Sequence, residues 1–552
     1  MKISGKSKII GALVGFVAIV IVAFTPPAEK YFDIAKNLDI FATLFREINA
    51  FYVDEVDPQP LIHTGIDAML ESLDPYTDYI PEDEAESFSV QTTGQYAGIG
   101  VLIGVINGKT VVTQPYEGFP AEMAGLKVGD EIVFVDGKNV RSRPPVEVSE
   151  MLKGNRNTEV EVGVARQGTK GELRFKIRRE KIKIKNVTYY GMSDNKIGYI
   201  RLEDFNPGAG KEVHDAVVDL KSKGANSLIL DLRNNPGGLL VEAVNIVSIF
   251  IPKGKEVVST RGKVKDWNKT YNTLNAPVDI EIPLVVMVNG GSASASEIVA
   301  GALQDYDRAV LVGHKTFGKG LVQITRQLPY NSQLKVTTAK YYIPSGRCIQ
   351  ALDYTHRSKD GSVHRTADSL KREFKTSGGR SIYDGDGLLP DENLSDMDLA
   401  IITKSLVAQG IIFEYASKYC GSHEQPTSIS DFKLSDFDYK EFTQWLKDSK
   451  FSYESYLDHY TNELITMAKE EKYYDQLKGT IDGLKGQIIE SRKSDLIRFQ
   501  KEISGILEDE IVFHYQLNTG QSAYRLKNNP EILVAKRVLG NKEEFKRTLS
   551  PN

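Results

Sequence analysis

The sequence predicts a multidomain protein of the mixed α/β class. At 552 residues and 41% hydrophobic composition, the chain can bury several cores and is too long for one compact domain. Helical and strand-like patterns alternate between residues 196 and 328, as in parallel strands joined by crossover helices. Shorter alternating runs precede this stretch, and helical patterns lie toward both ends. The predicted order is an export segment, a helical region, a β-rich module, an α/β core and a helical extension, over residues 1–27, 28–95, 96–180, 181–395 and 396–552.

The N-terminal segment, residues 1–27, has the chemistry of an export signal. Three lysines precede an uncharged run from Ile9 to Thr25, and two prolines end the run. A run of this length lies at the lower edge of what spans a bilayer, and no clear A-x-A cleavage pattern follows it. We therefore interpret it as an uncleaved signal anchor or a cleaved signal peptide, both of which place the remaining chain outside the cytoplasm. A buried core helix is the third interpretation.

Two regions separate this segment from the α/β core. Residues 28–95 carry apolar side chains at helical spacing. From residue 96 the chain changes to short alternating runs, and an Asn-Gly pair at 107–108 and an Asp-Gly pair at 136–137 are hairpin signals. This pattern predicts a compact β-rich module over 96–180. At the other end, the extension is mainly charged, Tyr-rich helical sequence.

Composition excludes some classes of function. The formal net charge is -5 and no basic block stands out, so nothing indicates nucleic acid as the main partner. The two cysteines, Cys348 and Cys420, form neither a disulfide framework nor a CxxC metal pair. Whether they form a single bridge stays open.

The stretch NGGSASASEIVAGALQD, residues 289–305, places three serines between an apolar strand and a helix. Catalytic groups in open α/β sheets gather beyond the carboxyl ends of the strands, which is where these serines lie. A helix beginning near Ser294 would direct free N–H groups and a positive dipole end at the turn, which suits an oxyanion. The alternative is that Ser292, Ser294 and Ser296 only cap the helix. A Gly-x-Ser-x-Gly elbow is not matched, and His314, the one histidine nearby in sequence, shows no Ser-His-Asp order.

The stretch GHKTFGKGLVQITRQL, residues 313–328, supplies a candidate base. It nearly matches the phosphate-loop motif G-x-x-x-x-G-K-[ST]. However, Gly320 occupies the position where Ser or Thr should hold magnesium, and strand-like residues follow instead of a helix. We therefore set an NTPase aside. Lys319 lies between two glycines, so its amine can approach another group closely. Burial beside a serine would lower the pKa of this lysine, and the neutral amine could then take the hydroxyl proton; the alternative is a solvated charge.

Six motifs in combination resemble those of the carboxyl-terminal processing peptidases, the tail-specific protease family that uses a Ser-Lys catalytic pair and carries a PDZ domain. The similarity covers residues 40–391. The motifs are LDPYTDYIP, GIGV, PAEMAGLKVGDEIVFVDG, LDLRNNPGGLL, SASASEIVAGALQD and GHKTFGKGLVQ. The resemblance implies an α/β protease core with an inserted β-rich PDZ domain, a helical N-terminal region and a helical C-terminal extension.

The same resemblance assigns the catalytic residues. The nucleophile would be Ser294, the middle serine of SASAS, and the general base would be Lys319. Gln323 would orient the lysine amine by a hydrogen bond. Glu297 and Asp305 also match acidic positions of the family, and we interpret both as structural supports of the helix and the site rather than members of the catalytic pair.

Two sets of binding positions follow from the resemblance as well. The oxyanion donors would be the backbone N–H groups of Ala295 and of either Gly237 or Gly238, because glycines let a backbone approach a substrate carbonyl closely. In a PDZ domain a peptide adds a strand to a sheet edge, and backbone N–H groups hold its terminal carboxylate. The positions that match this carboxylate loop are Gly98, Ile99, Gly100 and Val101. The alternative for this loop is a plain β-turn.

The chain departs from the family pattern in two places. Cys348 stands where the family often has a small hydroxyl residue, and we attach no catalytic meaning to it. The extension, residues 396–552, goes beyond the common core of the family. We expect it to form a helical platform for a homo-oligomer or for an adaptor.

The sequence thus predicts an exported serine endopeptidase that recognises apolar C-terminal tails of proteins and requires no cofactor or metal. It would lie on the periplasmic side of the inner membrane, tethered by its apolar segment, or be secreted to the periplasm. Its activity should rise through an apparent pKa well below that of a free lysine. The alternatives are a non-enzymatic PDZ scaffold or a regulated inactive protease awaiting a partner. A metal-dependent hydrolase is a third interpretation, which lacks an HExxH motif or clustered His and carboxylate ligands.

Overall fold

The structure is a computed structural model that describes residues 28–193, 196–358, 360–395, 399–449 and 451–550. By its internal contacts the chain divides into two units, Met1–Tyr79 and Ile80–Asn552. The first unit contains the helices α2 (Ala28–Phe51) and α3 (Pro58–Glu71), in agreement with the helical pattern of this region. None of the helices in the described ranges is long and apolar enough to cross a membrane. The predicted export segment, residues 1–27, lies outside the described residues.

The second unit begins with a short helical stretch and the predicted β-rich module. The stretch consists of η1 (Glu82–Glu84) and α4 (Ala85–Thr93). A six-stranded antiparallel sheet follows in the order β3-β4-β5-β7-β8, with β6 paired to β5, and β3 lies at its edge. Its strands are β3 (Val101–Ile106), β4 (Lys109–Pro115), β5 (Glu131–Val135), β6 (Lys138–Asn139), β7 (Glu159–Ala165) and β8 (Glu172–Arg178). The module is completed by β2 (Gln95–Gly98) paired with β9 (Glu180–Lys183), and by the helices α5 (Pro120–Met123) and α6 (Pro145–Leu152).

Both predicted hairpin turns are confirmed. Asn107 and Asp136 each have a φ of 49°, and a glycine with positive φ follows each of them. Two successive residues of this conformation form the type I′ turn that matches the twist of paired strands.

The α/β core contains one mixed sheet in the order β10-β11-β12-β15-β16-β23. The strands are β10 (Val187–Ser193), β11 (Ile197–Leu202), β12 (Ser227–Asp231), β15 (Leu284–Val288), β16 (Val310–Gly313) and β23 (Glu392–Asn393). All pairs are parallel except β10 with β11. The alternation seen in the sequence is therefore confirmed as parallel strands with crossover helices. Every residue of β12 and β15 is buried, because helices cover both faces of the sheet.

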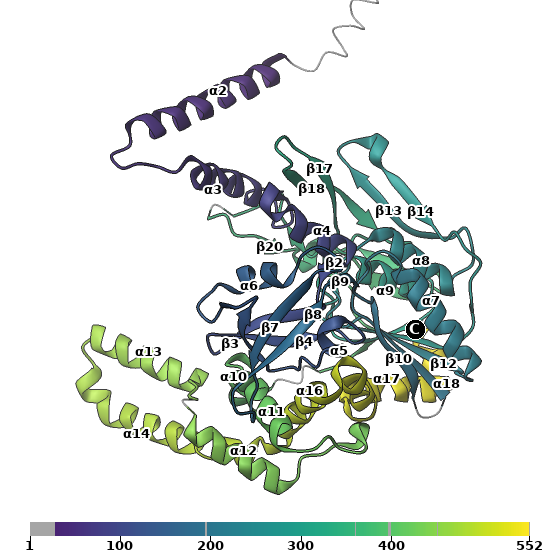
Figure 1. Cartoon of the computed structure of the whole chain (residues 1–552). Helices are drawn as coiled ribbons and strands as arrows, with labels where there is room; N and C mark the ends of the chain where they lie inside the picture. The colour runs from purple at the N-terminus through teal and green to yellow at the C-terminus, as the bar shows by residue number, and fades with distance from the viewer. Residues whose placement is uncertain (1–27, 194–195, 359, 396–398, 450, 551–552) are drawn as a thin grey trace, which may run out of the picture. The chain divides into compact units, whose positions relative to one another are not determined.

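The two faces of this sheet are covered by helices from different parts of the chain (Figure 1). The first face packs on α7 (Ala209–Ser222), α8 (Leu240–Phe250) and α9 (Ala295–Asp305). The second face packs on α17 (Pro530–Gly540) and α18 (Lys542–Thr548). Successive strand residues point to opposite faces, so Leu230 joins the first cluster and Ile229 the second. The sequence-based boundary at residue 395 leaves α17 and α18 in the extension, whereas the structure packs them on the core sheet.

A second sheet carries the hairpin that leads away from the candidate base. Four of its five strands are β13 (Glu256–Gly262), β14 (Lys269–Asn272), β17 (Leu321–Gln327) and β18 (Gln333–Tyr342). They pair antiparallel, with β13 between β14 and β18, and β17 on the other side of β18. The strand predicted after Lys319 is thus confirmed. The short remaining elements are β1 (Asp78–Ile80), η3 (Lys265–Trp267), β19 (Leu352–Asp353), β20 (His364–Arg365), η4 (Asp368–Leu370), β21 (Glu373–Lys375), β22 (Ser381–Tyr383) and η5 (Ile429–Asp431).

The helical extension has its own hydrophobic cluster. Its helices are α10 (Ile401–Ala408), α11 (Ile411–Ser422), α12 (Asp436–Asp448), α13 (Tyr456–Glu470), α14 (Tyr474–Arg492), α15 (Asp495–Arg498) and α16 (Gln500–Asn528). The cluster is built from α10, α11, α12 and α16. The helices α13 and α14 pack on each other as a hairpin away from this cluster (Figure 1). A kink at Gln516 and Leu517 divides α16 into two helical segments.

The β-rich module is docked on α11 and α16 of the extension. The carboxylate of Glu117 accepts hydrogen bonds from the backbone N–H of Thr519 at 3.0 Å and from its hydroxyl at 2.6 Å. Gly129 approaches α11 so closely that a Cβ atom there would lie 2.2 Å from the Ser417 hydroxyl oxygen. Only glycine fits such an approach. The extension therefore holds the module by contacts that the sequence alone did not predict.

Candidate active site

The three serines of the predicted site have different environments. The Ser292 hydroxyl donates to the carbonyl of Leu232 at 2.8 Å, and the Ser296 hydroxyl donates to the carbonyl of Asn235 at 2.9 Å. Both serines are fully buried, and these bonds hold the turn to the loop that follows β12. Ser294 is partly exposed. It is the only one of the three whose side chain is available to a substrate in this arrangement.

Ser294 has an unusual backbone conformation at the start of α9. It is the N-cap residue of this helix, with φ 53° and ψ -112°, and it forms a capping box with Glu297. A positive φ at a residue other than glycine is strained, and such strain persists only where the surroundings impose it. The helix predicted to begin near Ser294 is confirmed. Ser294 is also the N-cap residue that the alternative interpretation of the serines expects. The first N–H groups of α9 lack partners within the helix and therefore point toward the space beside the Ser294 side chain.

A single buried carboxylate joins the turn of the candidate nucleophile to the loop of the candidate base. The backbone N–H groups of Ser294 and Lys319 each donate to Oε2 of Glu297 at 2.9 Å. Its Oε1 accepts from the Thr316 hydroxyl at 2.6 Å and from the Gly318 N–H at 2.8 Å. Burial raises the pKa of Glu297 to about 7, although the four hydrogen bonds act in the opposite direction. Glu297 thus acts as the structural support that its position in the motif indicates.

Tyr341 joins the same two segments from the other side. Its hydroxyl donates to the carbonyl of Ser294 at 3.2 Å and also contacts the carbonyl of Lys319. The backbone N–H of Tyr341 donates to the carbonyl of Gly320 at 3.0 Å, and the side chain is 1% exposed. The sequence analysis did not single out Tyr341. The hairpin of β17 and β18 brings it beside Lys319, and no local pattern in the sequence marks that register.

The candidate base lies where the loop enters β17. Lys319 is half-buried, and Gly320 beside it passes so close to another backbone segment that a Cβ atom would lie 2.8 Å from the Gln350 nitrogen. Gln323 follows on β17, and its amide donates to the Thr337 hydroxyl on β18 at 3.1 Å. Asp305, at the far end of α9, is buried and accepts from Arg347 at 2.9 Å.

The loop after β12 lies against the Ser294 turn. A Cβ atom on Gly237 would lie 2.9 Å from the Cβ of Ser294, so only glycine allows this approach. The N–H of Gly237 donates to Oδ1 of Asn235 at 2.9 Å. In the part of the chain that the structure describes, the N–H groups of Gly238 and Ala295 donate to no other group, and Gly238 is exposed. The geometry therefore favours Gly238 over Gly237 as the partner of Ala295 in an oxyanion site.

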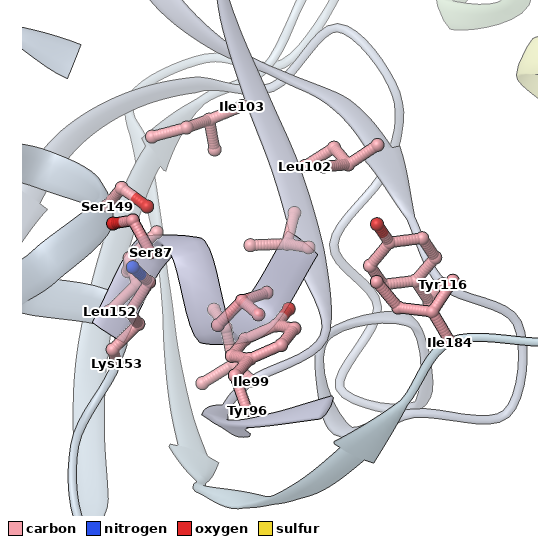
Figure 2. A pocket seen from close by; sticks show the side chains of 12 residues that line it. Ser87, Tyr96, Ile99, Leu102, Ile103, Tyr116, Ser149, Leu152, Lys153 and Ile184 are labelled. Carbon is pink, nitrogen blue, oxygen red and sulfur yellow. The ribbon is translucent and has the colours of Figure 1, made fainter. Parts of the chain in front are cut away.

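The predicted carboxylate loop opens onto a groove of about 260 Å³. Figure 2 shows the side chains that line it, which come from the loop and β3, from α6, from α4 and from the segments around Tyr116 and Ile184. Predicted positions Ile99 and Val101 line the groove, whereas Gly98 and Gly100 are not among its lining residues. The lining residues are Ser87, Val90, Tyr96, Ile99, Val101, Leu102, Ile103, Tyr116, Ser149, Leu152, Lys153 and Ile184.

Tyr96 is one of the residues that line this groove. Burial raises the pKa of Tyr96 to about 12, whereas hydrogen bonds from the backbone N–H groups of Val101 and Gly100 act to lower it. These two N–H groups belong to the loop that the sequence predicts to bind a terminal carboxylate. The Tyr96 oxygen therefore already accepts hydrogen bonds from this loop.

Other titratable groups lie away from Ser294. Nε2 of His314 is 3.1 Å from Oε1 of Glu531 on α17. In the extension, His423, Asp438 and Glu441 have potential ligand atoms within 4.8 Å of one another. Imidazole and carboxylates of this kind suit a divalent cation, but they belong to the helical extension and not to the core that holds Ser294. Cys348 and Cys420 are both free, so no bridge joins them.

Comparison with known proteins identifies the families that three parts of the chain resemble. The model of peptidase family S41 matches residues 196–355, the PDZ domain model matches 111–166, and the model "Probable PDZ-protease, C-terminal helical domain" matches 402–539.

A carboxy-terminal-processing protease of Bartonella bacilliformis is 38% identical over 324 residues, which are 58% of this chain and 74% of that protein. A probable CtpA-like serine protease of Staphylococcus aureus is 38% identical over 350 residues, 62% of this chain and 69% of the relative. Among solved structures, the photosystem II D1 C-terminal processing protease is 27% identical, covers 68% of this chain and 97% of its own, and has a TM-score of 0.35.

Proposed function

Because the chain belongs to peptidase family S41, as a C-terminal-processing serine protease with a PDZ domain, we propose that it works through a Ser-Lys pair. In this proposal Ser294 is the nucleophile and Lys319 is the general base. The observation that carries it is the position of Glu297, which binds the backbone N–H groups of Ser294 and Lys319 with one oxygen. Tyr341 adds a second connection between the same two residues.

The proposed reaction has two halves. The neutral amine of Lys319 takes the hydroxyl proton of Ser294, whose oxygen attacks the carbonyl carbon of the scissile peptide bond. The oxyanion then accepts hydrogen bonds from the N–H groups of Ala295 and Gly238. As the C–N bond breaks, the leaving amine takes the proton from Lys319, and an acyl-enzyme remains on Ser294. Water then attacks the ester with Lys319 again as base, and Gln323 orients its amine.

The groove of the PDZ domain supplies the proposed specificity. A free strand edge at β3 and a largely apolar lining favour a tail that adds to the sheet with apolar side chains inward. The loop Gly98, Ile99, Gly100 and Val101 would hold the terminal carboxylate through its backbone N–H groups, with the carboxylate replacing the Tyr96 oxygen as the acceptor for Gly100 and Val101. Cleavage would then occur upstream of the bound tail, in the stretch of chain that reaches Ser294.

Location and assembly are further parts of the proposal. The apolar run in residues 1–27 supports export to the periplasmic side of the inner membrane, as a signal-anchored or a secreted protein. The hairpin of α13 and α14 carries a set of exposed apolar side chains, which supports binding of an adaptor or a second copy. These side chains are Tyr456, Leu457, Tyr460, Leu464, Met467, Leu477 and Leu484.

The test is peptidase activity of residues 28–552 on an unfolded protein that ends in an apolar tail. We expect Ser294→Ala and Lys319→Ala each to lower kcat by about 10⁴-fold or more, because the pair acts as a unit. Lys315→Ala is the matched control: this lysine lies in the same loop but pairs with Asp386 at 2.9 Å. It should keep activity within a few-fold, and circular dichroism should be unchanged in all three variants.

Other outcomes would contradict the proposal. Cleavage that survives both substitutions would assign the chemistry to other residues. Tail binding by the unaltered chain without any cleavage would favour a non-enzymatic PDZ scaffold or a regulated protease that awaits a partner. Equal cleavage of tails with a free and an amidated C-terminus would remove the proposed role of the carboxylate loop.

A further inference from the structure

We propose that helix α4 forms the outer wall of the tail groove and that Val90 on this helix limits the size of the terminal side chain that the groove accepts. The proposal rests on the proposed function, in which the groove binds C-terminal tails. It adds a specificity-determining residue from outside the β-rich module, since α4 precedes the first strand of that module.

The groove has three walls. The sheet edge at β3 and the helix α6 supply two of them through Val101, Ile103 and Leu152. The third wall consists of Ser87 and Val90, which are three residues apart and therefore lie on one face of α4. Ser149 and Leu152 of α6 line the same groove as Ser87 (Figure 2), so the groove lies between residues of both helices. A tail that adds to β3 would therefore contact α4.

The C-terminal end of α4 is fixed to the groove. Its cap residue Gly94 donates its N–H to the carbonyl of Val90 at 2.8 Å and accepts a hydrogen bond from the N–H of Ile184 at 2.9 Å. Ile184 itself lines the groove. Gly94 has a φ of 63°, and a Cβ atom there would lie 2.8 Å from the Asn206 side-chain nitrogen. These contacts hold Val90 at a defined distance from the floor of the groove.

A fixed apolar wall selects by size. A groove open on that side would accept terminal side chains of any length, whereas a closed one excludes those that would overlap Val90. Replacing Val90 by alanine removes two methyl groups from the wall and leaves room for a larger terminal side chain. A change of this size in a hydrophobic pocket alters discrimination by about ten-fold or more.

The test compares two peptides that differ only in a terminal valine or phenylalanine. Their affinities are measured by fluorescence anisotropy on the full chain carrying Ser294→Ala, which prevents turnover, with and without Val90→Ala. We expect Val90→Ala to raise the affinity ratio of the phenylalanine peptide over the valine peptide by about ten-fold. Ser89→Ala is the matched control, because Ser89 lies on the same helix but does not line the groove. It should leave the ratio unchanged.

Three results would overturn the inference. An unchanged ratio in Val90→Ala would show that the tail does not contact this wall. An equal rise in both affinities would show that α4 competes with the tail instead of selecting it, since a competing helix weakens all ligands by the same factor. If neither peptide binds the chain that carries only Ser294→Ala, the proposed function fails together with this inference; binding with an unchanged ratio removes the inference alone.

Discussion

Glu297 is the residue whose ionisation state bears most directly on the site. Burial raises its pKa to about 7, from 4.5 for the free side chain. The folded chain therefore holds this proton more tightly than the unfolded chain. The site stabilises the fold below about pH 4.5, and this contribution is lost as the pH rises through about 7.

We expect the free energy of unfolding to fall between about pH 5 and about pH 8 by less in Glu297→Gln than in the unaltered chain, because glutamine does not titrate. Urea unfolding at both pH values measures this difference. The variant should also lose about 100-fold in kcat, since its amide group would face backbone N–H donors with donors of its own. The same pH dependence in both proteins would contradict the role of Glu297.

Tyr341→Phe tests whether the tyrosine hydroxyl positions the catalytic segments. Its loss removes the bond to the Ser294 carbonyl and the contact with the Lys319 carbonyl. We expect kcat to fall about ten-fold or more while KM changes little, because Tyr341 is not among the residues that line the tail groove. Tyr342→Phe is the control, since the neighbouring ring stacks against Arg261 and not against the site. A proportional rise in KM would instead indicate a general loss of structure.

At the scale of the element, the turn before α9 uses its serines for separate purposes. Ser292→Ala and Ser296→Ala each remove one hydrogen bond to a buried carbonyl that keeps a second, backbone donor, which costs about 0.5–1.5 kcal/mol of stability. We expect both variants to unfold at lower urea concentration and to keep kcat within a few-fold, whereas Ser294→Ala loses activity. Combined unfolding and activity measurements on the three variants check this. A near-complete loss of activity in a stably folded Ser296→Ala would contradict the assignment of the nucleophile.

Whether each of these elements could be predicted depends on how far apart in the sequence its defining contacts lie. The helix after Ser294 and the strand after Lys319 were predictable, because local periodicity and the residues at their ends specify them. Tyr341 was not, because its place beside Lys319 depends on the pairing of β17 with β18. The position of α17 was not predictable either: its buried stripe, which includes Ile532 and Ala535, shows that the helix packs but not which surface it packs on.

At the scale of the whole molecule, α17 and α18 complete the core although they lie at the far end of the chain. They cover the sheet face that carries Ile229, Val285 and Val312. A chain that ends at residue 528 would expose this face to water. We expect it to bind the dye ANS and to lose cooperative thermal unfolding, because an uncovered apolar face of this kind promotes a loosely packed state.

The matched control removes a different part of the extension. Replacing residues 460–488 by a short Gly-Ser linker deletes most of the hairpin of α13 and α14, which buries side chains such as Ile481 mainly within itself. This variant should unfold cooperatively at nearly the temperature of the unaltered chain. If instead both deletions abolish cooperative thermal unfolding, the hairpin of α13 and α14 is part of the core and is not a separate part of the fold.

Because α17 covers one face of the core sheet, the fold cannot be completed until this helix has been synthesised. A ribosome adds about 5–20 residues per second, so the roughly 200 residues between β16 and α17 take on the order of 10–40 s to make. Ser294 and Glu297 are made before that interval and Lys319 at its start, while one face of the sheet is still uncovered. The newly made chain therefore passes through a stage in which the residues proposed for catalysis are present but one face of the core sheet is uncovered, and it completes its fold only after residue 540 has been made.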